Sequence, residues 1–108
     1  MNWYKLFPSK ETLLEALGPE QRRIVKIGAR KVCLIWHEER FYAFDNLCPH
    51  NKHSLLEGVV NYIGEIVCPL HAYRYSLHDG GECEGRSIPL KIHQLVEKED
   101  GMYLGLVP

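Results

Sequence analysis

Two short pairs of residues, Cys48-Pro49-His50 and Cys68-Pro69-Leu70-His71, decide the interpretation of this sequence. Each pair holds one Cys and one His, so the chain offers two thiolates and two imidazoles as ligands. These are the side chains that bind zinc, copper and iron–sulfur centres in proteins. The sequence therefore predicts a metal centre held between two loops, with Cys48, His50, Cys68 and His71 as its ligands.

The residues around the two pairs extend the pattern over nearly the whole chain. A glycine lies where the first loop ends, and an aromatic-basic-aromatic run with a glycine turn follows the second pair. These features, together with two later segments, are Gly58, Tyr73-Arg74-Tyr75, Gly80, Ile88-Pro89-Leu90 and Asp100–Leu104. From Trp3 to Leu106 the sequence resembles the Rieske ferredoxin family, in which two His replace two Cys on one iron of a [2Fe–2S] cluster.

The resemblance implies that Cys48 and Cys68 bind one iron and that His50 and His71 bind the other. Two thiolates and two neutral imidazoles bring a diferric cluster to zero charge, whereas four thiolates bring it to −2. An added electron meets less repulsion at the neutral site, so the potential is higher. Rieske centres lie at about −150 to +300 mV, against about −400 mV for plant-type ferredoxins. The sequence thus predicts a one-electron carrier rather than an enzyme.

Two loop positions differ from the pattern that the resemblance implies. The family has Gly two residues after the first ligand His and directly after the second, where this chain has Lys52 and Ala72. Because Gly at such sites permits positive φ or close backbone approach, we expect the backbone of both loops to be slightly shifted. Lys52 has two interpretations of equal weight, a solvated lysine or a cation that favours the reduced cluster or helps a partner dock.

The resemblance also predicts how the surroundings of the cluster set its reduction potential. High-potential relatives have a disulfide between the loops, and this chain has His53 and Leu70 at those positions. By the same resemblance, Tyr75 places a hydroxyl near a ligand sulfur, and Tyr73 replaces a serine. We expect one hydrogen bond to sulfur and a potential in the lower half of the Rieske range.

Other cysteines and histidines are expected to be ordinary residues. Cys33 lies in an apolar run and predicts a small buried side chain, whereas Cys83 lies between two carboxylates and predicts an inert loop thiol. The remaining histidines are interpreted as solvent-facing, and four aromatic residues as core; they are His37, His53, His78 and His93, and Trp3, Trp36, Phe41 and Phe44.

Composition limits the function classes. The chain has 108 residues, 13 Lys and Arg against 14 Asp and Glu, and a net charge of −1. The length predicts one domain, and the balance of charges excludes the basic footprint of a nucleic-acid binder. No apolar run reaches membrane-spanning length, and the start shows no apolar signal core, so we expect a cytoplasmic protein without a membrane contact.

Short strand patterns dominate between turn residues, and a short helix is expected over Ser9–Gly18, with Ser9 as its cap. Many short strands predict an all-β antiparallel sandwich or barrel. The resemblance narrows this to the Rieske fold over residues 1–108, a β-sandwich base with a smaller inserted cluster-binding subdomain at about 46–85. Expected strands are 3–7, 23–27, 31–36, 41–44, 59–62, 65–67, 73–77, 90–97 and 102–107.

Three functions remain open at this stage. The first is a ferredoxin that passes electrons from an NAD(P)H-dependent flavoprotein reductase to a terminal oxygenase, docking through the His50/His71 edge with Pro49, Leu70 and Lys52 at its rim. The second is the small subunit of NADH-dependent nitrite reductase, which has the same size and fold. The third is a zinc-binding module without redox function, because structural zinc also accepts two Cys and two His.

Overall fold

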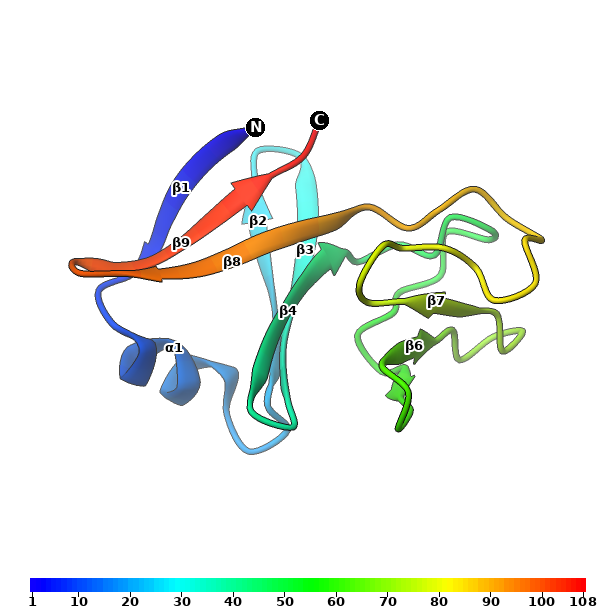
Figure 1. Cartoon of the computed structure of the whole chain (residues 1–108), viewed down its shortest axis with the longest axis horizontal. Coiled ribbons are helices and arrows are strands. Elements are labelled where there is room, and N and C mark those ends of the chain that lie inside the picture. The colour runs from blue at the N-terminus through cyan, green and yellow to red at the C-terminus, as the bar shows by residue number, and fades with distance from the viewer.

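A computed structural model describes all residues from Met1 to Pro108. The chain is built almost entirely from strands, with one short helix (Figure 1). The elements in chain order are β1 (Asn2–Phe7), α1 (Lys10–Leu17), β2 (Arg22–Ile27), β3 (Arg30–His37), β4 (Arg40–Asp45), β5 (Val59–Val60), β6 (Glu65–Val67), β7 (Arg74–Ser76), β8 (Ile92–Lys98) and β9 (Gly101–Leu106). Every strand expected from the sequence is present, although β5 and β7 are shorter than expected and β8 begins two residues later.

Six strands form one antiparallel sheet in the order β1-β9-β8-β4-β3-β2. Its two halves join at β4 and β8, which share only the pairs Ala43↔His93 and Phe44↔Ile92. The sheet therefore turns a corner there, and β1, β8 and β9 face β2, β3 and β4 (Figure 1). An apolar core fills the space between the halves, and α1 closes its open end with Leu13 and Leu17.

Three strands, β5-β6-β7, form a second small antiparallel sheet, which lies to the right in Figure 1. The first ligand loop connects β4 to β5, and the second connects β6 to β7. Arg22 of β2 holds the first loop in place, because its guanidinium donates to the backbone oxygens of Leu56 and Gly58 at 2.7 and 2.6 Å. Both loops thus lie in the part of the molecule that the small sheet organises.

Strand β3 explains how the two parts are joined. Its run Val32-Cys33-Leu34-Ile35 is buried at every position. Side chains alternate along a strand, so Val32 and Leu34 enter the core under α1, while Cys33 and Ile35 enter a second core under the small sheet. A strand covered on both faces is apolar throughout, and this accounts for the unbroken run in the sequence.

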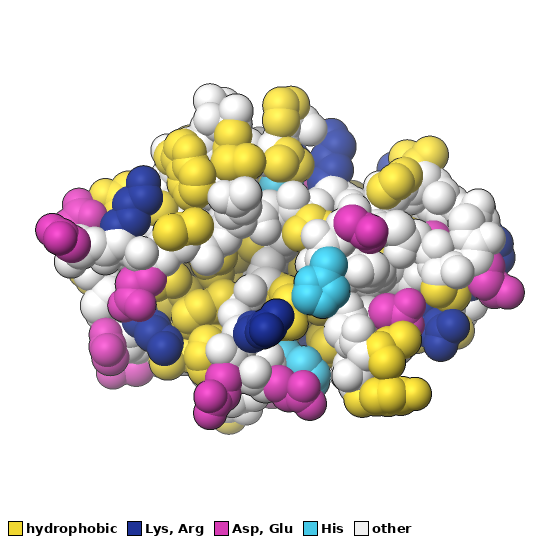
Figure 2. Space-filling view, in the orientation of Figure 1, with side chains coloured by type: hydrophobic (Ala, Val, Ile, Leu, Met, Phe, Trp, Pro, Cys, Tyr) yellow, Lys and Arg dark blue, Asp and Glu magenta, His cyan; other side chains and the backbone are white.

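Helix α1 begins and ends as its sequence predicts. The Ser9 side chain accepts a hydrogen bond from the Thr12 backbone at 3.0 Å, and Gly18 ends the helix with φ 73°. The assignment of Trp3 to the core is wrong: the residue is 43% exposed on edge strand β1, under the Lys98 ammonium. Figure 2 shows apolar side chains gathered over β1 and β9. The structure contains no helix of the length and apolarity that spanning a bilayer requires.

Candidate metal centre

The two ligand loops have the same backbone geometry. In the first, the Cys48 N–H donates to the His53 oxygen at 2.8 Å, and the Lys52 N–H donates to the Cys48 oxygen at 2.7 Å. In the second, Cys68 donates to Tyr73 at 2.8 Å, and Ala72 donates to Cys68 at 2.9 Å. Each Cys is therefore clamped by two hydrogen bonds to the residues that follow its paired His, and this holds the four side chains in place.

Lys52 and Ala72 occupy equivalent positions in these two loops, and both have a left-handed backbone, with φ of 62° and 59°. The expected shift of the loop backbone does not appear in these φ values. Both residues adopt the conformation that Gly adopts without strain. An L-residue with a Cβ pays roughly 1–2 kcal/mol for that conformation. The loops therefore keep a glycine-like geometry and carry local strain.

The four predicted ligands divide into a buried sulfur pair and an exposed imidazole pair. Cys48 and Cys68 are 0% and 1% exposed within the core under the small sheet. The rings of His50 and His71 lie at the surface with centroids 5.6 Å apart. No three His, Cys, Asp or Glu side chains gather around a point that one metal ion could occupy. A [2Fe–2S] centre needs only two protein ligands per iron, and this separation into two pairs fits it.

Polar groups face both sulfurs. The Tyr75 hydroxyl lies 3.4 Å from Cys48 Sγ and 3.2 Å from Ser87 Oγ. Burial and the neighbouring Cys48 raise the pKa of Tyr75 to about 12, so the hydroxyl keeps its proton. On the second sulfur, Asn51 Nδ2 lies 3.8 Å from Cys68 Sγ. The sequence predicted the Tyr75 contact, but Asn51 acts across the loops and no local pattern marks it.

His50 is held by a stack of planar groups. The Tyr73 ring lies parallel to the His50 ring, with centroids 3.9 Å apart and planes 12° apart. The Arg86 guanidinium covers the other face of Tyr73, 3.9 Å from the ring centroid. Stacking and cation–π attraction both favour this order, so Tyr73 and Arg86 fix the orientation of the imidazole.

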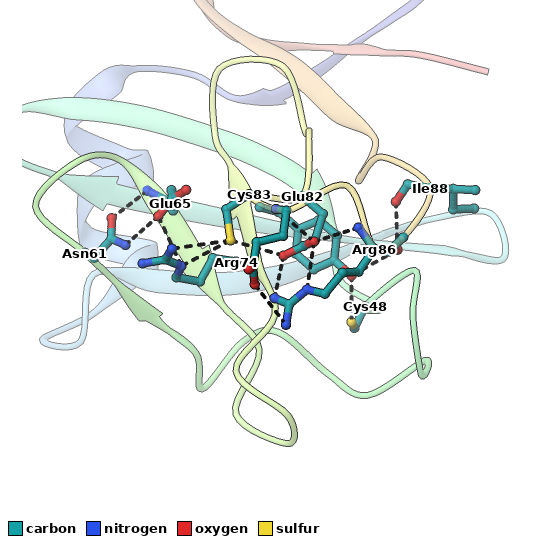
Figure 3. Close-up of polar contacts among 11 residues, drawn as sticks. Cys48, Asn61, Glu65, Arg74, Glu82, Cys83, Arg86 and Ile88 are labelled. Carbon is teal, nitrogen blue, oxygen red and sulfur yellow. Dashed lines mark hydrogen bonds and ion pairs between the residues drawn. The ribbon is translucent and has the colours of Figure 1, made fainter.

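Residues 82–87, named here the strap, connect the side chains that contact the two predicted ligands of the first loop, Cys48 and His50. Its centre is the Glu82 carboxylate, which is fully buried and accepts from the backbone of Glu84 and from both the backbone and guanidinium of Arg86 (Figure 3). These bonds, foremost that from the Arg86 side chain, hold the pKa of Glu82 far below its usual range. The strap places Arg86 over Tyr73 and Ser87 against Tyr75, so it braces the aromatic side chains that contact His50 and Cys48.

Cys83 belongs to the strap and lies beside a guanidinium that the sequence did not indicate. Arg74 Nε and Nη2 each lie 3.4 Å from Cys83 Sγ, and Glu82 Oε2 lies 3.2 Å from it (Figure 3). The expectation of a thiol between two carboxylates therefore omitted a cation. Cys33 matches its prediction, because it is fully buried in β3 and burial raises its pKa to about 12.

The interpretation of His93 as a surface residue is wrong. Its side chain is fully buried beside the β4–β8 corner, with Nε2 2.7 Å from Asp45 and Nδ1 accepting from the Val107 backbone at 3.1 Å. Arg30 also donates to Asp45 at 3.0 Å. Burial raises the pKa of Asp45, but the bonds from His93 and Arg30 outweigh it and leave the pKa below its usual value. The group anchors the end of β4, from which the first ligand loop starts.

Comparison with known proteins agrees with this geometry. Residues 2–94 match the Rieske [2Fe-2S] domain family. The chain belongs to this family. Among curated proteins, the 3-phenylpropionate/cinnamic acid dioxygenase ferredoxin subunit of Photorhabdus laumondii is 32% identical over 84 residues, covering 71% of this chain and 80% of the relative. The alkene monooxygenase ferredoxin component of Xanthobacter autotrophicus is 29% identical, covering 79% of this chain and 70% of the relative.

Solved structures show the same fold. The chain superposes with a TM-score of 0.73 and 25% identity on a chain from the complex of reduced oxygenase and oxidised ferredoxin in carbazole 1,9a-dioxygenase, covering 95% of this chain and 92% of that one. The ferredoxin of carbazole 1,9a-dioxygenase from Nocardioides aromaticivorans has a TM-score of 0.73 at 20% identity.

Membership of the family decides between the open interpretations of the metal centre. The Rieske domain implies one [2Fe–2S] cluster per chain, so the zinc module is set aside. When bound, the cluster accepts and releases one electron. The protein is thus an electron carrier of the Rieske ferredoxin type.

Proposed function

We propose that Cys48 and Cys68 bind one iron of the cluster, that His50 and His71 bind the other, and that the two imidazoles form the electron port. The single observation that supports this is the division of the four side chains into a buried sulfur pair and an exposed imidazole pair. Burial keeps water from the sulfurs, whereas the exposed ring edges lie where a partner can approach. In this proposal residues 46–85 act as the cluster-binding subdomain of the single domain 1–108.

The acceptor in this proposal is a terminal oxygenase, and the donor is an NAD(P)H-dependent flavoprotein reductase in the cytoplasm. The support is that the curated relatives are named as ferredoxin components of monooxygenase and dioxygenase systems. The partner docks over His50 and His71. Leu70, whose side chain is half-exposed, provides apolar contact at the rim.

One comparison favours a second function. The nitrite reductase [NAD(P)H] large subunit of Klebsiella oxytoca is 31% identical over 84 residues, which cover 68% of this chain and 9% of that protein. A Rieske domain of this kind therefore also matches a segment of a nitrite reductase. In this second proposal the chain is a subunit that stays bound to a large reductase instead of shuttling between partners.

Spectroscopy of purified holoprotein tests the ligand assignment. The expected results are two irons and two labile sulfides per chain and a paramagnetic signal after reduction with dithionite. Replacing His50 or His71 with Ala should abolish the Rieske signal. The matched control is His53→Ala, which removes an exposed imidazole only three residues from His50 and should leave the signal unchanged. A signal that survives the double substitution of His50 and His71 would refute the assignment.

A further inference from the structure

A groove lies beside the first ligand loop, which supplies part of its lining, and contains none of the four predicted ligands. Its volume is about 520 Å³. Three stretches line it: the turn and first residues of β3, the end of β4 with the first ligand loop, and the coil that precedes β8. They come together where the large sheet adjoins the small one (Figure 1). This volume falls within the range of about 300–1,000 Å³ that ligand-binding clefts have.

The groove carries an uncompensated positive charge. Its single carboxylate, Asp45, is already bound by Arg30 and His93. The other three charged side chains are Lys31, Lys52 and Lys91, all exposed, and no carboxylate lies within ion-pair distance of any of them. In a chain of net charge −1, three lysines are thus gathered in one groove without a partner.

Apolar side chains line the same groove. Leu47 and Ile88 are 46% and 70% exposed, and Pro49, which directly precedes His50 in the chain, also lines the groove. Large apolar side chains exposed together mark an interaction site more often than a bare surface does. Because Pro49 and Lys52 flank His50, the groove is continuous with the proposed electron port.

We propose that this groove binds an acidic segment of the redox partner, one that carries carboxylates for Lys31, Lys52 and Lys91 and at least one bulky apolar side chain for Leu47 and Ile88. The inference rests on the proposed function and adds the chemistry of the partner. Opposite charges steer the encounter and set the orientation, and the apolar contact holds the complex. The groove thus positions the partner so that its acceptor faces His50 and His71.

Binding of synthetic peptides to oxidised holoprotein tests the proposal. The probe is a fluorescein-labelled dodecapeptide of alternating Glu and Leu, compared with the same peptide carrying Gln in place of Glu. Fluorescence anisotropy at low salt should show binding of the Glu peptide and much weaker binding of the Gln peptide. The difference should vanish near 1 M salt, where the screening length is about 3 Å.

The decisive variant is Lys31→Gln/Lys91→Gln, which leaves the ligand loops untouched. Each exposed charge pair accounts for a factor of about 1.5 to 5, so the double variant should bind the Glu peptide about 2- to 25-fold more weakly. The matched control is Lys10→Gln/Arg40→Gln, which removes the half-buried Lys10 ammonium over Trp36 and the exposed Arg40 guanidinium. Both lie at the end of β3 and β4 that is far from the groove, so the control should change binding less than twofold. Ile88→Ser should weaken binding at high salt as well.

Equal binding of the Glu and Gln peptides, no binding of either, or equal effects of the two double variants would overturn the proposal. Displacement of the peptide by millimolar inorganic phosphate would also overturn it, because the groove would then be a small-anion site. The reduced paramagnetic signal is recorded for every variant. Its absence in the wild type would refute the proposed function, whereas its presence with lysine-independent binding would refute the groove alone.

Discussion

Ala72 offers a direct test of the strain in the second ligand loop. The residue has φ 59° and an exposed side chain, and its N–H donates to the Cys68 oxygen. Replacing it with Gly keeps that hydrogen bond and removes only the Cβ that makes the left-handed backbone unfavourable. Because the methyl group is exposed, the substitution loses no packing. We therefore expect Ala72→Gly to stabilise the folded protein.

The magnitude is the difference of two terms. The left-handed conformation costs a residue with a Cβ roughly 1–2 kcal/mol, and Gly recovers this. The unfolded chain gains freedom with Gly, which costs about 0.4–1 kcal/mol. The free energy of unfolding should thus rise by about 1 kcal/mol, which is roughly 4 °C in Tm for a domain of this size.

The assay is the thermal midpoint of the holoprotein at one fixed heating rate, followed by circular dichroism and by bleaching of the cluster absorbance. Ala29→Gly is the matched control, because Ala29 is also an exposed loop alanine but has no positive φ. It should lower the midpoint. If Ala72→Gly lowers the midpoint as Ala29→Gly does, position 72 stores no strain and the reasoning fails.

Three further outcomes are expected. Tyr75→Phe should lower the midpoint potential by about 20–60 mV in a protein-film titration, since one neutral hydrogen bond of about 0.5–1.5 kcal/mol to sulfur is lost; an unchanged potential removes Tyr75 from the account. Gly80→Ala should lower Tm by several degrees for two reasons: the new Cβ would clash with the Leu90 backbone oxygen, and Gly80 has φ 82°, which is unfavourable for Ala. An unchanged Tm would contradict this contact. Because the pKa of Asp45 is lowered in the folded protein, its carboxylate contributes stability above about pH 4, and this contribution is lost as the pH falls through the pKa of the folded state. Asp45→Asn should therefore make the free energy of unfolding fall less steeply in acid. Urea unfolding at a series of pH values measures this slope.

Local patterns in the sequence were enough to predict most of the fold. Strands were predicted correctly because their apolar runs end at turn residues, and the helix because Ser9 and Gly18 mark its ends. The buried stretch of β3 was recognisable as a strand, but its position between two cores was not, since burial on both faces depends on what packs there. The same limit explains Trp3, whose apolar character does not show that its strand lies at an edge.

The four candidate ligands were predicted from two local motifs, but the groups around them were not. His93 was misassigned because its partner Asp45 lies 48 residues earlier in the chain. Glu82 was interpreted only as a charge beside Cys83, although its burial depends on Arg86 folding back over it. Such contacts between distant or unpatterned residues leave no periodic signal, so sequence reasoning proposes the ligands but misses the groups that support them.

The strap has a consequence for redesign of the redox centre. Its six residues contact Tyr73 through Arg86 and Tyr75 through Ser87. In the proposed ligand assignment, the strap therefore lies next to a group that contacts a ligand of each iron. Its internal hydrogen bonds converge on Glu82, so the six residues fold around one carboxylate. Exchanging the whole hexapeptide between homologous carriers should therefore change the reduction potential with fewer mismatched contacts than a single substitution, which would alter the contact to Tyr73 or to Tyr75 but not both.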